Sequence, residues 1–188
     1  NPKSVFTGGT GGHTYNSMQL IVGTDVVLSS GITEIVGEDG GAAFRPDVNT
    51  TYNTYSNGSG TVKFTSSSLQ RLYSTSQAAS AYNQFYNLIL EKTTSTLQGL
   101  TTVGFHIKVE NDLTITSGIL NTNTTSTDPI INHDLTVTGT TTIGDAGATG
   151  VDYATLTTNE SAIDLQGTNN TTPGLKMLSG GTYNGVAN

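Results

Sequence analysis

One short segment recurs along the chain, and this recurrence constrains the possible folds more than any other feature. Residues Asp112 to Gly118 have the sequence DLTITSG, and residues Asp134 to Gly139, which begin 22 positions later, have the sequence DLTVTG. A looser relative, NLILEKT, begins at Asn87, 25 positions before the first copy. A spacing in the low twenties with several short strands per unit is typical of the coils of a parallel β-solenoid. We therefore predict an all-β fold, and within it a parallel β-solenoid, or β-helix.

Successive coils of a solenoid place equivalent residues on top of one another. With the copies aligned, Leu88, Leu113 and Leu135 fall in one inward ladder. Thr114 and Thr136 then fall in an outer row, where β-branched packing and hydroxyl pairing stabilise a solvated sheet face. The residues predicted to form the stacked core are Leu88, Leu90, Leu113, Ile115, Leu135 and Val137.

Strand signals dominate the rest of the chain, because β-branched and aromatic residues alternate with Thr, Ser or Asn. The one helix candidate is Ser74 to Tyr86, and it lacks an apolar stripe at the 3.6-residue period, so we expect at most one helical turn there. The predicted strands are Met18–Val22, Val26–Leu28, Ile32–Val36, Thr61–Thr65, Gln70–Tyr73, Phe85–Glu91, Phe105–Val109, Asp112–Thr116, Ile130–Ile131, Leu135–Thr138, Thr141–Ile143, Tyr153–Thr157, Ala162–Leu165 and Leu175–Leu178.

The repeat is less regular before residue 87, and an antiparallel β-sandwich of the pilin type remains the alternative, because short alternating strands are common to both folds. We predict a single all-β domain over residues 1–188. Within it we expect a flexible arm over 1–16, an irregular part over 17–57, repeat coils over 58–144 and C-terminal strands over 145–188.

Charge and composition exclude several kinds of partner. Only 11% of the residues are charged, the net charge is −7, and the seven basic residues are scattered. Nucleic acid is not expected as a partner, because phosphate binding needs concentrated Lys and Arg. Cysteine is absent, so disulfides and thiolate metal sites are not expected. No apolar run reaches the ~18 residues of a membrane span, and a start at Asn1-Pro2 suggests a processed export product or a fragment.

Three segments together resemble a known class of proteins: Gly58 to Phe64 (GSGTVKF), Phe85 to Thr93 (FYNLILEKT) and Asp112 to Gly118. They are similar to the repetitive β-helical regions of large secreted, often adhesin-like, surface proteins of bacteria. The resemblance covers roughly Gly58 to Gly144, and Asp134 to Gly144 also resembles the repeats of phage tail fibres. It implies an extracellular or cell-surface location, whereas Val151 to Asn188 match neither pattern.

The resemblance and the exposed backbone edges of such a fold predict an extracellular structural protein and not an enzyme. We expect a subunit of a surface filament or fibre that pairs strands with copies of itself, without a cofactor. The residues predicted to contact a neighbouring subunit are Val5, Phe6, Tyr15, Met18, Leu20, Val22 and Val186.

Two other functions stay open. An adhesin or phage-fibre-like module would bind glycans or host surfaces, with Tyr52 and Tyr55 as candidate glycan contacts. A polysaccharide lyase or hydrolase on a β-helix would need an acidic, calcium-binding cluster beside a basic residue. Asp145 and Asp152 are weak calcium candidates, since neither an EF-hand nor a calcium-solenoid motif is present. We predict no catalytic residue and no metal site.

Overall fold

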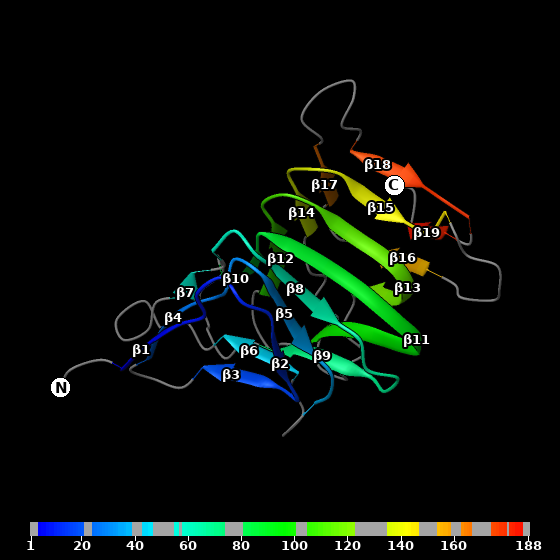
Figure 1. Ribbon diagram of the computed structural model, residues 1–188. Coiled ribbons are helices and arrows are strands. Elements are labelled where there is room, and N and C mark those ends of the chain that lie inside the picture. The colour runs from blue at the N-terminus through cyan, green and yellow to red at the C-terminus, as the bar shows by residue number, and fades with distance from the viewer. Residues whose placement is uncertain are drawn as a thin grey trace.

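Parallel β-strands make up all the regular structure that is described. The computed structural model describes residues 4–20, 24–38, 43–46, 55–56, 58–73, 81–100, 105–122, 135–146, 154–158, 163–166, 174–179 and 181–185. These residues contain 19 strands and no helix (Figure 1). The all-β prediction is confirmed.

The strands fall into three rows. Row A contains β1 (Ser4–Thr7), β4 (Thr24–Val27) and β7 (Tyr55–Ser56) in one sheet, and β10 (Ala81–Phe85), β12 (Phe105–Val109), β14 (Leu135–Val137) and β17 (Ile163–Leu165) in another. Row B contains β2 (His13–Tyr15), β5 (Ile32–Ile35), β8 (Thr61–Phe64), the first part of β11 (Asn87–Leu100), the first part of β13 (Leu113–Asn121), β15 (Thr141–Ile143) and β18 (Leu175–Met177). Row C contains β3 (Met18–Leu20), β6 (Phe44–Pro46), β9 (Gln70–Tyr73), the second parts of β11 and β13, β16 (Ala154–Thr158) and β19 (Gly181–Gly185).

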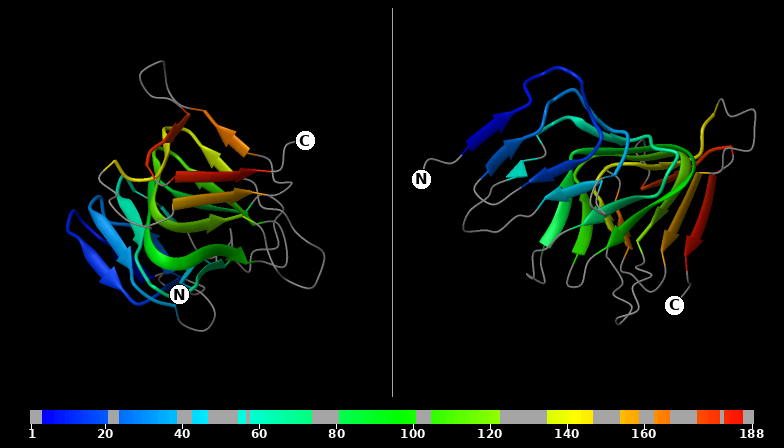
Figure 2. Two further views of the ribbon diagram at one scale, coloured as in Figure 1. Left: turned by 90° about the vertical axis from the view of Figure 1, so that its right-hand side faces the viewer. Right: turned by 90° about the horizontal axis from the view of Figure 1, so that it is seen from below.

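Each row advances in chain order, as the two views of Figure 2 show. The chain visits row A, then row B, then row C, and β11 and β13 bend so that one strand serves two rows. Gly118 lies at the bend of β13 with a φ of 85°, a conformation that residues with a Cβ rarely adopt. Every pairing between described strands is parallel. An antiparallel sandwich would pair its strands in the opposite sense.

The three rows face one interior. Phe44 from row C, Phe64 from row B and Phe85 from row A are fully buried. Their ring centroids lie 5.3 Å apart for Phe44 and Phe85, 6.4 Å for Phe64 and Phe85, and 6.5 Å for Phe44 and Phe64. These separations suit tilted and edge-to-face aromatic packing. Side chains from all three rows therefore meet in a common core.

The register corrects the predicted Leu ladder. Leu88 pairs with Leu113 and Leu90 with Ile115. Leu113 then pairs with Thr141, 28 positions on, and not with Leu135. Leu135 and Val137 lie in row A, opposite Ile107 and Val109. All six predicted core residues are fully buried.

The reason for this error is that the two similar segments occupy different places in the repeat. The segment at 112 follows a corner and enters row B, whereas the segment at 134 precedes the next corner and lies in row A. The true row B spacing is 25 residues from Leu88 to Leu113 and 28 from Leu113 to Thr141. A spacing of 22 therefore compares strands on different sheets.

The N-terminal third is more regular than the sequence predicts. Within the expected flexible arm, β1 pairs with β4 and β2 pairs with β5. Within the expected irregular part, β5 pairs with β8 and β6 with β9. Short strands separated by long connections carry too little alternation to be recognised locally.

Only the last residues of the helix candidate are described, and they form a strand. Residues 81–85 form strand β10, which pairs along its length with β12. Residues 74–80 lie outside the described part of the chain.

Candidate functional site

Strands β18 and β19, at the end of their rows, expose apolar side chains whose partners on the preceding strands are buried. Along row B one inward column runs in register from Tyr15 through Ile35, Phe64, Leu90, Ile115 and Ile143 to Met177. The members from Ile35 to Ile143 are fully buried, whereas Met177 is 43% exposed. Leu175, at 38%, and Tyr183, at 41%, are exposed opposite the buried Thr141 and Leu156. At this end of the molecule, apolar side chains that point into the core are exposed to solvent.

The backbone at this end is also open. Among the described strands, β17, β18 and β19 each pair on one side only, with β14, β15 and β16. A strand with one unpaired edge presents a row of N–H and C=O groups that another chain can pair with. Apolar side chains and backbone groups thus coincide on one end face, which we name the C-terminal layer.

At the opposite end, formed by β1, β2 and β3, Tyr15 and Met18 are less exposed than Met177. Met18 is only 8% exposed, and Tyr15 packs against the core. The His13 ring stacks on the Tyr15 ring at a centroid distance of 6.2 Å, and His13 Nε2 lies 2.8 Å from the Gly8 carbonyl oxygen. We name this face the N-terminal layer.

The residues predicted to contact a neighbouring subunit lie mostly in the N-terminal layer. Tyr15 and Met18 belong to the N-terminal layer, with Val5 and Phe6 on β1 and Leu20 on β3, where no side chain is described. Val22 and Val186 lie outside the described residues. Sequence reasoning missed Leu175, Met177 and Tyr183, although the apolar Leu-x-Met pattern of β18 marks its inward face.

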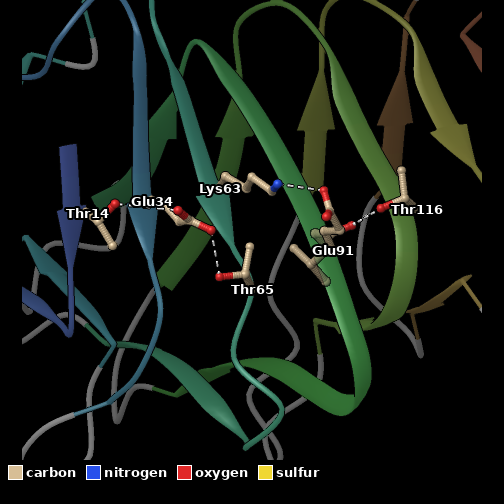
Figure 3. A network of polar contacts seen from close by, with 7 residues as sticks. Thr14, Glu34, Lys63, Thr65, Glu91 and Thr116 are labelled. Atoms are coloured by element: carbon tan, nitrogen blue, oxygen red, sulfur yellow. Dashed lines mark hydrogen bonds and ion pairs between the residues drawn. The ribbon is translucent and has the colours of Figure 1, made fainter. Parts of the chain in front are cut away.

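Polar side chains on the outer face of row B link neighbouring strands (Figure 3). Glu34 accepts hydrogen bonds from Thr65 at 3.0 Å and from Thr14 at 3.5 Å. Lys63 and Glu91 form an ion pair at 2.6 Å, and the Thr116 hydroxyl donates to the Leu90 carbonyl oxygen at 3.0 Å. These contacts link consecutive strands from β2 to β13. Each is weak, because exposed ion pairs contribute about 0–1 kcal/mol.

A corner between rows A and B carries a second polar ladder. Asn111 Nδ2 donates to Asn87 Oδ1 at 2.8 Å, and the Thr140 amide donates to Asp112 Oδ1 at 2.8 Å. In the next layer Gly139 approaches the backbone of Asn111 so closely that a Cβ would collide with it. These side chains satisfy corner backbone groups that the strand ladders leave unpaired.

A buried lysine is the strongest unexpected group. Lys92 has no exposed surface, and its ammonium donates to the carbonyl oxygens of Ser66 at 2.8 Å and Ser68 at 2.9 Å, and to Gln70 Oε1 at 2.7 Å. Burial lowers the pKa of Lys92 to about 8, against the opposing effect of the Glu38 charge. Alternation could have revealed it, because Lys92 follows Leu88 and Leu90 on the inward side of β11.

Gln70 contacts this lysine directly, and the charge of Glu38 acts on it. Gln70 is fully buried, and its Nε2 donates to the carbonyl oxygens of Ile35 at 3.1 Å and Gly37 at 2.8 Å. Glu38 Oε1 forms an ion pair with Arg71. Glu38 Oε2 is buried and has no hydrogen-bond partner among the described residues. We name Glu38, Gln70 and Lys92 the buried amine cluster.

The structure brings no further residues to the predicted calcium and glycan sites within the part of the chain that it describes. Asp145 is exposed, and Asp152 lies outside the described residues. Within the described part of the chain, no group of three or more His, Cys, Asp or Glu could hold a metal ion. Tyr55 lies on β7 without a described side chain, and Tyr52 is outside the description. No helix among the described residues is long and apolar enough to cross a membrane.

Known proteins provide no template for these sites. No protein-family model, no curated protein and no solved structure matches the chain.

Proposed function

We propose that the three rows are the faces of a parallel β-solenoid, and that the chain is a structural subunit that stacks end to end into an extracellular filament. The meeting of Phe44, Phe64 and Phe85 supports the solenoid, because each ring comes from a different row. Equivalent layers would then repeat along one axis.

The C-terminal layer supports the filament. Docking the N-terminal layer of a second copy onto it would continue all three rows with strands of the same direction. It would cover Leu175, Met177 and Tyr183 and pair the open backbone edges. A contact between two different faces of one subunit does not close on itself unless a rotation brings it back, so it generates open filaments.

The composition of the lateral faces fits the same function. The outer column of row B passes through Thr14, Glu34, Lys63, Ile89, Thr114, Thr142 and Lys176 in register. Four of its seven residues are uncharged, and its two adjacent charges, Glu34 and Lys63, are opposite in sign. Such a face is solvated along the length of a fibre, while the apolar surface is concentrated at its end.

The test is a charge placed on the C-terminal layer. The wild-type chain should form filaments, or oligomers whose size grows with concentration, in negative-stain electron microscopy and sedimentation velocity. Met177→Glu should remain monomeric, because burying a carboxylate between layers without a partner is costly. Ile32→Glu is the matched control, since Ile32 is 50% exposed on β5, which is paired on both sides.

The outcomes separate clearly. Filaments of wild-type and Ile32→Glu protein with monomers of Met177→Glu support the proposal. A wild-type chain that stays monomeric at every concentration, or Met177→Glu filaments of normal length, contradict it. Circular dichroism establishes that each variant remains folded.

A further inference from the structure

The buried amine cluster holds the parts needed for a covalent cross-link. Lys92 Nζ lies 2.7 Å from Gln70 Oε1, and both residues have no exposed surface. Because Oε1 is bonded to Cδ, the amine stands close to the ~3–3.5 Å at which reacting atoms are held in near-attack geometries. The two residues are 22 positions apart and come from β9 and β11, which are paired neighbours.

The surroundings hold the amide in one orientation. Both N–H groups of Gln70 are directed at backbone carbonyl oxygens, those of Ile35 and Gly37. The Lys92 ammonium polarises the carbonyl from the other side. Water has little access, because both residues are fully buried, and hydrolysis therefore competes poorly with attack by the amine.

Glu38 supplies the proton chemistry. Its charge acts on the Lys92 ammonium, and its Oε2 is buried without a described hydrogen-bond partner. Because Glu38 Oε2 makes no hydrogen bond to the Lys92 ammonium, a proton passes between them by rotation of the Lys92 side chain or through one bridging water. Arg71 holds the other oxygen of Glu38 and so fixes the carboxylate in place.

We propose that Lys92 and Gln70 join in an intramolecular amide cross-link that forms spontaneously once the chain has folded. Lys92 gives one proton to Glu38, and the neutral amine attacks Cδ of Gln70. A bond forms between Nζ and Cδ, and the bond between Cδ and Nε2 breaks. Nε2 leaves as ammonium, because it takes up both protons that Lys92 has lost, one directly from Nζ and one through Glu38, and Glu38 returns to its carboxylate form. No oxidant, metal or further reactant takes part.

The consequence is a covalent tie between adjacent layers. The cross-link closes the loop from residue 70 to residue 92 and restricts the unfolded chain, as a disulfide does. It would serve a chain that has no cysteine, and it does not depend on the proposed filament.

The first test is the mass of the intact native protein. After incubation at pH 9, the wild-type chain should weigh less than its sequence by one ammonia, and digestion should yield one branched peptide containing Gln70 and Lys92. Lys92→Arg should keep the full mass, and so should Gln70→Glu, which preserves the side-chain shape. Lys63→Arg is the matched control and should lose ammonia like the wild type.

Peptide mapping is essential, because an Asn-Gly pair can also lose ammonia by cyclising on its own backbone, and Asn57-Gly58 is such a pair. A native wild-type chain of unchanged mass overturns the proposal, whichever variants fold. An ammonia loss that persists undiminished in Lys92→Arg, or that maps to Asn57, overturns it as well.

The pH profile tests the role of Glu38. Glu38→Gln should slow the reaction at least tenfold, so that unreacted protein can be followed with time. The rate should rise with pH as Lys92 becomes neutral and should level off at or below about 8, since the pKa of buried Lys92 is about 8 with the Glu38 charge present. A rate independent of pH between 6 and 9 contradicts attack by the neutral amine.

Discussion

The two ends of the molecule are built from the same strand rows but end in different ways. At the N-terminal layer, Met18 is 8% exposed, and its amide donates to the Ala43 carbonyl oxygen at 2.8 Å. At the C-terminal layer, Met177 is 43% exposed, although the Leu178 amide beside it donates to the Ile143 carbonyl oxygen at 2.8 Å. The backbone ties both ends to the layer beneath, whereas the Met18 side chain is buried and the Met177 side chain is exposed. Backbone pairing of the last strand therefore does not by itself bury the apolar side chains of that strand.

The largest expected loss of stability comes from a substitution in the core between the two ends. Phe64→Ala should lower the free energy of unfolding by about 3–5 kcal/mol, because it removes a buried ring and leaves a cavity where the three rows meet. Urea denaturation followed by circular dichroism measures it. A loss below ~1 kcal/mol would mean that the rows do not share a core, and the comparison of their ends would lose its basis.

The comparison itself is tested by the same substitution at both ends. Met18→Ala should cost about 2–5 kcal/mol, as buried methionines do. Met177→Ala should cost less than about 1 kcal/mol, because its side chain is already largely solvated in the monomer. Both are measured by denaturation at concentrations where the chain is monomeric. Equal losses would show that the two ends are equally covered.

A smaller effect separates side-chain ties from backbone ties. Asn111→Ala removes the hydrogen bond to Asn87 at a corner and should cost about 0.5–1.5 kcal/mol. The exposed Thr10 provides the control, since Thr10→Ala should change stability by less than ~0.5 kcal/mol. If Asn111→Ala has no effect, the hydrogen bond between Asn111 and Asn87 adds nothing to the stability of this corner.

The smallest effect belongs to the outer face. Lys63→Met breaks the ion pair with Glu91, and we expect a loss of about 0–1 kcal/mol that vanishes in high salt. Denaturation at low and high ionic strength measures the difference. A loss of unfolding free energy above ~2 kcal/mol that persists in high salt would show that the outer face stabilises the fold more than the exposed Met177 does.

Local patterns predicted the strands well where alternation is strong. Gln70–Tyr73, Phe105–Val109 and Thr141–Ile143 have the bounds that the sequence predicts. The predicted strand from Phe85 is instead two strands, β10 and β11, which meet at a corner near Tyr86. A corner of one or two residues does not interrupt the alternation enough to be seen.

Lys92 shows the limit of residue-type reasoning. A lysine ordinarily indicates a solvated position, and only its place in the Leu88, Leu90 alternation points inward. Its acceptors come from residues 66, 68 and 70, which no local pattern connects to it. The candidate sites at the C-terminal layer and the buried amine cluster thus depend on contacts between distant segments.

The sequence by itself determined that the chain forms strands and which side chains of each strand turn inward, because a strand alternates its faces with a period of two residues. Only the tertiary structure decided which strand lies over which, and so placed Leu135 beside Ile107 and left Met177 uncovered. The physical reason is that parallel partners are joined by connections of variable length, here giving row B steps of 25 and 28 residues between Leu88, Leu113 and Thr141. Register is set by how side chains pack across those connections, and not by the residues of any one strand.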